Sequence, residues 1–422
     1  MKKLKFSLLL TLALSITSSI MPSAKPLAAE NPPEINGLSA ITLDYETGEI
    51  IYAKNIDEKR YPASTTKLMT SLLLAENKQK SDIITYTESA YKQPEYALRT
   101  NIYFNLKVGD TFTAEDTMKA LLLFSANDAA YMVADNVGGN VENFIKMMND
   151  KAKAIGMNNS NFVTANGLHD DNHYTTAYDL ALLGRAAMEN PWVRETAGTK
   201  KDMITLLTTG QPAYVENRNK LVGVNGNIGG KTGYTSLAGK CLVSVYERDG
   251  RKIVGVVMKA AYDAEDTMMY KDMEAIIDYS YKVQKTVTKP KGTTIDTVTL
   301  EYKPLKFFGP KKTIEVPVVI NDDVNYYEND INKSEIKYET KLNDIDPWAL
   351  SQDTAIGSLV VTQRNALATK EIALYPTISA SDLRAANTGF YIGVVVGAIG
   401  IIALLILLIS VIRRGSRRRR SY

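Results

Sequence analysis

A run of 24 residues near the end of the chain, from Gly389 to Ile412, contains no charged side chain. It consists mostly of Val, Ile, Leu, Gly and Ala, and about 20 such residues suffice for a helix to cross a bilayer. The arginines that follow are Arg413, Arg414, Arg417, Arg418, Arg419 and Arg420. Such a basic cluster normally stays in the cytoplasm. We therefore predict a transmembrane helix over 389–412, a basic cytoplasmic tail over 413–422 and a body outside the membrane.

The N-terminus carries a second, shorter apolar segment. Three lysines within the first five residues precede an apolar run from Phe6 to Ile16, and small residues such as Ala28 and Ala29 follow it. This run is too short for a membrane span and is typical of a secretory signal peptide, which we assign to residues 1–29.

Charge and cysteine content restrict the partners and the chemistry of the exported part. The formal net charge is +3, but ten of the 50 basic residues lie in the two terminal segments. The remaining 40 face 47 acidic residues, so the exported part has a net charge near −7 and is a poor surface for nucleic acid. Cys241 is the only cysteine, which excludes an internal disulfide. It lies in an apolar alternation, where we expect a small buried hydrophobic residue.

Residues 30–285 combine strand and helix patterns. Strands are predicted over 37–45 and 50–54, and the turn Asp249-Gly250 joins two more over 240–246 and 252–259. Apolar residues at helical spacing predict helices that begin near Ser64 and that cover 114–124, 127–137, 141–155, 176–189 and 265–282. We expect an α/β domain in which helices, including a helical subdomain, flank an antiparallel sheet.

The composition changes after Lys285. Residues 286–377 carry alternating Thr, Val and Lys broken by Pro, as in 294–302 and 312–320, without a long helical pattern. This favours a small all-β C-terminal domain. Residues 378–388 would then be the linker to the membrane helix.

Three short motifs occur in order along the exported part: Ser64-Thr65-Thr66-Lys67, Ser125-Ala126-Asn127 and Lys231-Thr232-Gly233. A Ser-x-x-Lys string is weak by itself, because the chain has two more, at Ser89 and Ser334. Only the copy at Ser64 opens an apolar helix, on which residues three apart share a face. Lys67 can therefore reach the Ser64 hydroxyl, and the helix N-terminus places partial positive charge beside it. We expect Ser89 and Ser334 to be surface residues.

The first motif and Lys231 together predict a serine nucleophile with a lysine base. A serine hydroxyl is a weak nucleophile at neutral pH and needs an activating base. Lys67 can accept its proton only when neutral, and burial or a nearby positive charge favours that form. If the motifs converge, Lys231 supplies the charge and the two lysines titrate as a coupled pair.

The second motif suits a proton relay and a contact with the substrate. We expect Ser125 to relay a proton between base and leaving amine, and Asn127 to hold the peptide group of the substrate. Alternatively, this segment only caps the helix that follows.

The third motif is predicted on a sheet edge that faces Ser64. Lys231 and Thr232 can bind a terminal carboxylate, and Gly233 lets a substrate strand approach the backbone closely. The amides of Tyr234 and Ser64 can form an oxyanion hole. The complete set predicts a serine acyl-transfer site without metal or cofactor.

These motifs resemble those of the serine D-alanyl-D-alanine carboxypeptidases, the low-molecular-mass penicillin-binding proteins of bacterial cell-wall metabolism. The resemblance covers roughly residues 34–377. It implies a penicillin-binding/β-lactamase-like fold and a bacterial membrane enzyme with an extracellular catalytic domain. The implied reaction removes the terminal D-alanine from a peptidoglycan stem peptide ending in D-Ala-D-Ala. It also implies that β-lactam antibiotics acylate Ser64.

Further segments match the same family. Asn166-Gly167-Leu168 and Tyr178-Asp179-Leu180 resemble its loop and the helix downstream, which implies that Asp179 braces that loop. Two departures stand out. Tyr234 occupies a position where some members have histidine. Residues 260–272 contain no arginine for a second carboxylate contact and offer only Lys271.

Other functions stay open from sequence alone. A β-lactamase shares the motif types, but Glu142-Asn143-Phe144-Ile145-Lys146 lacks the Glu-x-x-Leu-Asn arrangement expected of it. An inactive wall-binding or sensor protein could keep the same fold. A metallopeptidase would use His169 and His173, yet both are predicted in a loop rather than on one helix. Neither histidine lies in a convincing Ser-His-Asp context.

Overall fold

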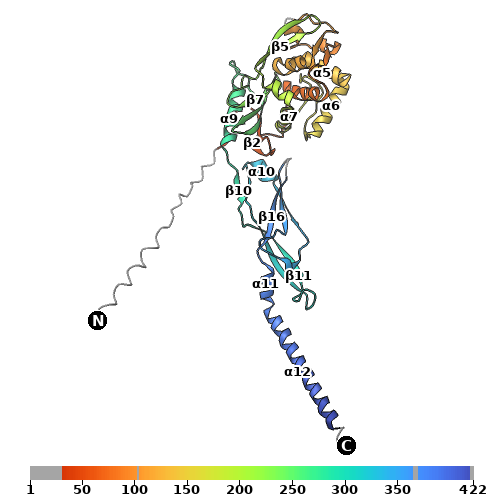
Figure 1. The fold of residues 1–422 in the computed structure, drawn as a ribbon. Coiled ribbons are helices and arrows are strands. Elements are labelled where there is room, and N and C mark those ends of the chain that lie inside the picture. Colours follow the sequence, from red (N-terminus) through yellow and green to blue (C-terminus); the bar gives the residue numbers. More distant parts are fainter. Residues whose placement is uncertain (1–30, 102–103, 365–368, 419–422) are drawn as a thin grey trace, which may run out of the picture. The chain divides into compact units, whose positions relative to one another are not determined.

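The computed structural model describes residues 31–101, 104–364 and 369–418. The predicted signal peptide and the last residues of the basic tail lie outside them. A five-stranded antiparallel sheet in the order β2-β1-β9-β8-β7 lies at the centre of the first part of the chain (Figure 1). Its strands are β1 (Ser39–Asp44), β2 (Ile50–Lys54), β7 (Asn227–Thr235), β8 (Gly239–Arg248) and β9 (Arg251–Ala260). The strands predicted near the start and near the end of residues 30–285 thus lie in one sheet.

Helices cover both faces of this sheet. Helix α9 (Met268–Lys282) packs on one face, in a core that includes Leu242 and Ile253. Helix α7 (Ala177–Glu189) packs on the other, in a core that includes Val243 and Val254. Successive residues of a strand point to opposite faces, so the continuous apolar runs of β8 and β9 fill two cores at once.

A helical subdomain adjoins the face covered by α7. Its elements are η1 (Ala63–Thr66), α1 (Lys67–Asn77), α2 (Glu88–Tyr91), α3 (Leu98–Asn101), α4 (Ala114–Lys119), η2 (Ala120–Phe124), α5 (Asn127–Gly138), α6 (Val141–Ala154) and α8 (Pro191–Ala197). The sequence did not predict two short ribbons, β3 (Ile83–Thr85) with β4 (Thr111–Thr113) and β5 (Lys201–Leu206) with β6 (Gln211–Glu216). The predicted mixed α/β architecture is confirmed.

Residues 286–377, which we call the β module, contain a second antiparallel sheet in the order β11-β12-β16-β15-β14 and the ribbon β10-β13. The strands are β10 (Thr286–Lys289), β11 (Thr294–Tyr302), β12 (Lys312–Ile320), β13 (Val324–Tyr326), β14 (Lys337–Leu342), β15 (Gly357–Thr362) and β16 (Lys370–Pro376). The module is not purely β, because α10 (Asp330–Glu335) and the turn η3 (Pro347–Ala349) interrupt the strands.

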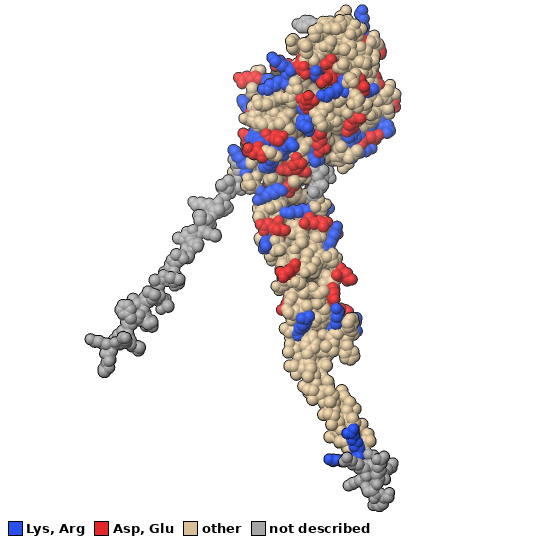
Figure 2. Space-filling model, viewed as in Figure 1, with Lys and Arg blue, Asp and Glu red and all other residues tan. Residues whose placement is uncertain are grey.

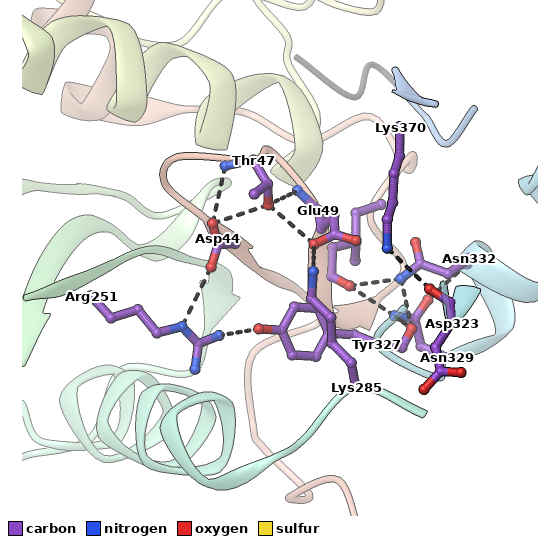
Figure 3. Close-up of polar contacts among 11 residues, drawn as sticks. Asp44, Thr47, Glu49, Arg251, Lys285, Asp323, Tyr327, Asn329, Asn332 and Lys370 are labelled. Atoms are coloured by element: carbon purple, nitrogen blue, oxygen red, sulfur yellow. Dashed lines mark hydrogen bonds and ion pairs between the residues drawn. The ribbon is translucent and has the colours of Figure 1, made fainter. Parts of the chain in front are cut away.

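Two asparagines of the β module bind the edge strand of the first sheet (Figure 3). Nδ2 of Asn332 donates to the carbonyl oxygen of Ile50 at 2.8 Å, and Nδ2 of Asn329 donates to the same oxygen at 3.0 Å. Asn332 is buried and also donates to the carbonyl of Tyr327 at 2.8 Å. These bonds satisfy a backbone group that the edge strand β2 would otherwise leave unpaired.

Charged side chains extend this interface (Figure 3). Arg251 at the start of β9 donates to the hydroxyl of Tyr327 at 2.7 Å and pairs with Asp44 at 3.4 Å. Lys285, the residue directly before the β module, pairs with Glu49 in the turn before β2. The β module is therefore attached through side chains that reach the hairpin β1-β2.

Helix α12 (Thr388–Arg418) contains the whole predicted span. Residues Thr388–Arg414 form a candidate membrane span of 27 residues, and none of its most apolar part is buried in protein. Figure 2 shows an uncharged stretch that ends at basic side chains. Helix α11 (Ala380–Ala386) occupies most of the predicted linker.

Candidate active site

Ser64 lies in the short turn η1, directly before α1. The residue before it, Ala63, has a φ of 49°, in the left-handed region that non-glycine residues rarely adopt. Such a conformation persists only where the surroundings hold it. Gly167 provides one such contact, since a Cβ on it would lie 1.9 Å from the carbonyl oxygen of Ala63. The loop around Gly167 therefore packs against the turn that carries Ser64 and holds it in place.

Lys67 is fully buried in the first turn of α1, and its ammonium group makes three hydrogen bonds. Nζ donates to Oγ of Ser64 at 2.9 Å, to Oδ1 of Asn127 at 2.8 Å and to the carbonyl of Asn166 at 2.7 Å. All three acceptors are uncharged. Burial, and then the charge of Lys231, lowers the pKa of Lys67 well below its ordinary value. A lysine that is neutral part of the time can accept the proton of Ser64.

The second motif lies where η2 meets α5. Ser125 is buried and has a φ of 73°, and no side chain caps the N-terminus of α5 at Ala126. Simple capping therefore does not explain this motif. The side chain of Asn127 contacts Lys67 through Oδ1 and donates to the carbonyl of Glu95 through Nδ2 at 2.7 Å. Asn127 thus orients the lysine, in addition to the substrate contact that the sequence predicted for it.

Asp128 anchors the start of α3, which contains Leu98 and Arg99. The sequence did not predict this role. The buried carboxylate of Asp128 accepts the backbone N–H of Leu98 at 2.8 Å, the N–H of Arg99 at 3.3 Å and the hydroxyl of Tyr86 at 3.1 Å. Each bond satisfies a group that would otherwise be buried unpaired. The one sequence signal for this role is that an acidic residue directly follows Asn127 of the second motif.

The third motif lies on β7, beside η1. Lys231 is buried and donates to the carbonyl of Thr232 at 2.9 Å. Burial, and then the charge of Arg218, lowers the pKa of Lys231 to about 7. A Cβ on Gly233 would lie 2.9 Å from the backbone nitrogen of Ser64. The backbone of β7 therefore approaches the serine as closely as glycine allows.

Cys241 lies opposite Gly233 on the neighbouring strand β8. It is completely buried, and burial raises the pKa of its thiol to about 11. A thiol with a raised pKa is a poor nucleophile. The predicted packing role of Cys241 is confirmed.

Aromatic side chains line the edge of the site next to β7. Tyr234 is 48% exposed, and its ring centroid lies 5.5 Å from that of Tyr262. Nζ of Lys240 lies 4.9 Å from the ring centroid of Tyr234 and pairs with Asp266 at 2.7 Å. Residues 260–272 therefore contribute an aromatic ring and an acidic partner for Lys240.

Arg218 adds a positive charge near Lys231 from outside residues 260–272, whereas Lys271, the cation that the sequence offered there, is exposed on α9. Arg218 lies on the connection between β6 and β7, and its charge acts on Lys231. Nε donates to the carbonyl of Phe124, next to Ser125, at 3.1 Å. Because β7 follows this connection directly, the sheet places Arg218 near Lys231, which the spacing of the motifs did not reveal.

Asp179 on α7 braces the loop between α6 and α7, as the family resemblance implies. Its buried Oδ2 accepts the N–H of Asn159 at 2.8 Å and the hydroxyl of Ser160 at 2.7 Å. The same loop supplies the carbonyl of Asn166 that binds Lys67. The loop is therefore fixed both at its start and where it contacts Lys67.

The two histidines of this loop have separate partners. Nε2 of His173 lies 2.9 Å from Oγ1 of Thr66, whereas Nε2 of His169 lies 3.3 Å from Asp171. Within the described ranges, no three His, Cys, Asp or Glu side chains group in a way that could hold a metal ion. His173 therefore supports the first motif through its hydrogen bond with Thr66.

Comparisons with known proteins give one consistent result. Residues 26–262 match the model of the D-alanyl-D-alanine carboxypeptidase family. The chain is 27% identical over 351 residues to the D-alanyl-D-alanine carboxypeptidase DacF of Bacillus subtilis, covering 83% of this chain and 86% of that protein. A solved DD-transpeptidase of Streptomyces has a TM-score of 0.55 and 28% identity, covering 60% of this chain and 100% of the other. The carboxypeptidase DacD of Francisella tularensis shares the fold over 84% of this chain and 97% of its own, with a TM-score of 0.59 and 23% identity.

Proposed function

Because this chain belongs to the D-alanyl-D-alanine carboxypeptidase family, we propose that it removes the terminal D-alanine from peptidoglycan stem peptides through an acyl-enzyme on Ser64. The main support is the 2.9 Å hydrogen bond between Nζ of Lys67 and Oγ of Ser64. This lysine is buried, its hydrogen-bond acceptors are uncharged, and its pKa is strongly lowered. These are the conditions under which a lysine acts as the base for a serine.

In the first half of the reaction, neutral Lys67 takes the hydroxyl proton while Oγ of Ser64 attacks the carbonyl carbon between the two D-alanines. The amides of Ser64 and Tyr234 bind the negative oxygen of the tetrahedral intermediate. Its collapse breaks the C–N bond, and Ser125 passes a proton from Lys67 to the departing amine. D-alanine leaves, and the rest of the peptide stays as an ester of Ser64.

In the second half, water attacks this ester and Lys67 again serves as the base. Oγ of Ser64 leaves and recovers its proton, and the shortened peptide is released. Until D-alanine leaves, Lys231, Thr232 and Arg218 bind the terminal carboxylate of the substrate. A β-lactam undergoes the same attack, but its amine stays tethered to the acyl group, so the serine remains acylated.

We also propose that α12 crosses the cell membrane. Arg413 and Arg414 follow the apolar part of α12, so the positive-inside rule puts them in the cytoplasm. The catalytic part then lies outside the cell, where peptidoglycan is found.

The deciding experiment measures D-alanine release from a synthetic pentapeptide ending in D-Ala-D-Ala, together with the intact mass of the protein after incubation with penicillin. We expect release and a covalent adduct for the wild type and neither for Ser64→Ala. Ser334→Ala, in an unrelated Ser-x-x-Lys string, serves as the matched control and should retain both. An adduct that survives in Ser64→Ala would refute the assignment of the nucleophile.

Other readouts separate the rival functions. Rapid turnover of nitrocefin would favour a β-lactamase, and binding of the peptide without D-alanine release would favour a wall-binding or sensor protein. Loss of activity with a chelator would favour a metallopeptidase.

A further inference from the structure

The loop that joins β11 to β12 exposes large apolar side chains. We call residues 303–311 the tip loop. Phe307 is 83% exposed and Phe308 is 74% exposed, and Leu305 beside them is 41% exposed. Adjacent exposed phenylalanines indicate a surface that contacts something other than water.

Hydrogen bonds and close packing connect the tip loop to the start of α12. The hydroxyl of Tyr391 donates to the carbonyl of Pro304 at 2.8 Å. Gly309 packs against the ring of Phe390, since a Cβ on this glycine would lie 3.4 Å from Cζ of that ring. Nζ of Lys312, just after the loop, donates to Oδ1 of Asn387 at 2.7 Å. Figure 1 likewise shows β11 and α11 at the end of the β module from which α12 departs.

The length of α12 places this junction at the surface of a bilayer. The candidate span Thr388–Arg414 has 27 residues, which extend over about 40 Å at about 1.5 Å per residue. This matches the roughly 40–45 Å of a bilayer that includes its headgroups. When Arg414 lies at one headgroup layer, Thr388 and Tyr391 lie at the other. The tip loop bound to Tyr391 then lies at that layer as well.

The chemistry of the junction suits phospholipid headgroups. A pocket of about 650 Å³ is lined by Lys306, Arg384, Trp348 and Tyr391, together with smaller apolar surfaces. Trp and Tyr are enriched at membrane interfaces, and Lys and Arg are attracted to an anionic lipid surface. Lys306 is only loosely paired with exposed Asp346 at 3.7 Å, a kind of contact that contributes little by itself.

We propose that the tip loop docks on the bilayer that α12 crosses. Phe307 and Phe308 lie in the boundary between headgroups and acyl chains, and the pocket between Lys306 and Arg384 binds the phosphate of an anionic phospholipid. This inference rests on the proposed membrane anchoring. A single helix leaves the β module free to pivot, whereas a second attachment fixes its orientation on the membrane.

The test uses the full-length protein with the environment-sensitive dye NBD on a cysteine introduced as Leu305→Cys. The native Cys241 is completely buried, so the new thiol is the one that reacts under native conditions. Tyr214→Cys, at an 80% exposed position on β6, is the matched control. Both proteins are reconstituted in nanodiscs of phosphatidylcholine with about one third phosphatidylglycerol, with and without a doxyl-labelled lipid quencher.

We expect the doxyl lipid to quench the label at position 305 at least twofold and the label at position 214 hardly at all. Phe307→Ser with Phe308→Ser, in the Leu305→Cys background, should reduce quenching to the control level while the protein still co-elutes with the nanodisc. Lys306→Gln with Arg384→Gln, or nanodiscs of phosphatidylcholine alone, should reduce it partially. D-alanine release from a soluble peptide verifies that each variant is folded.

Equal quenching at positions 305 and 214 in protein that co-elutes with nanodiscs would overturn docking and leave anchoring intact. Quenching that the Phe and Lys/Arg variants do not change would also overturn it. Burial of the label in a dimer instead of lipid would make its emission insensitive to the doxyl lipid and would likewise refute docking. Failure to enter nanodiscs at all would refute the anchoring itself.

Discussion

Nε2 of His173 lies 2.9 Å from the hydroxyl oxygen of Thr66, the residue directly before Lys67. Its Nδ1 accepts the backbone N–H groups of Val163 at 3.1 Å and Thr164 at 3.2 Å. Two donors at Nδ1 require the neutral tautomer with its proton on Nε2. His173 therefore joins the loop that binds Lys67 to the helix that carries it.

This arrangement predicts a specific loss of stability in acid. Burial lowers the pKa of His173 to about 4, below the roughly 6.5 of an unfolded chain. The unfolded state therefore binds more protons between these values, and the free energy of unfolding falls by about 3 kcal/mol from this group as the pH drops from above 6.5 to below 4. Denaturant unfolding at pH 7, 5 and 4 measures it. The stability difference between wild type and His173→Gln should shrink toward low pH, and His169→Gln should behave like the wild type. A difference independent of pH would contradict the assignment.

Lys67→Arg should abolish catalysis while keeping a positive charge in the site. An arginine does not lose its proton in proteins, so it cannot act as the base for Ser64. We expect the rate of D-alanine release to fall about 1,000-fold, within the range for loss of a general base. Penicillin acylation should slow in parallel. Lys92→Arg, in the unrelated string that begins at Ser89, is the control. Near-normal turnover by Lys67→Arg would assign the base to another residue.

The charge of Lys231 should limit activity on the alkaline side. Its pKa of about 7 means that the free enzyme loses this positive charge above neutral pH and binds the substrate carboxylate less well. We expect kcat/KM to fall above pH 7. Arg218→Gln removes a charge that lowers this pKa, so the alkaline limb should move to higher pH while KM rises. Lys220→Gln should leave the limb in place. An unchanged limb in Arg218→Gln would show that another group titrates there.

Gly233→Ala should slow the reaction by distorting the approach of β7 to Ser64. The new Cβ would lie 2.9 Å from the backbone nitrogen of Ser64, closer than real Cβ contacts, and 3.0 Å from that of Thr65, which is tighter than most of them. The strand must shift, which misplaces the amides of the oxyanion hole and should reduce kcat about 100-fold. Gly250→Ala, where no atom lies within 4 Å of the added Cβ, should affect stability but not kcat. Equal kcat values for the wild type and Gly233→Ala would rule out this geometry.

Asn332→Ala should loosen the β module from the first sheet. It removes the buried donor of the Ile50 and Tyr327 carbonyls, which keep only the bonds from Asn329 at 3.0 and 3.3 Å, at a cost of about 1 kcal/mol. Calorimetry of the full-length protein in detergent should then show a lower or divided unfolding transition. Ser334→Ala, an exposed change on the same helix, should keep the wild-type profile. Indistinguishable profiles for wild type and Asn332→Ala would show that these bonds do not support the interface.

Strong local patterns were sufficient for most elements of the fold. The strands predicted over 294–302 and 312–320 have the same bounds in the structure, because alternation and turn residues mark both ends. The ribbon β5-β6 was missed, because exposed polar residues give no alternation there. Helix α10 was missed as well, since it is short and is held by contacts with Ile50.

The motif residues could be identified from the chain alone, because Ser64 and Lys67 are joined by the geometry of one helical turn. The contacts of Arg218, Asp128 and Asn166 could not, because each acts on a partner supplied by a distant segment. The lowered pKa of Lys67 likewise depends on burial and on Lys231, which no local pattern encodes. Sequence therefore determined the proposed nucleophile, the order of the motifs and the apolar span. Only the tertiary structure decided which groups surround the lysine, because burial and approach of charges exist only once the chain has folded.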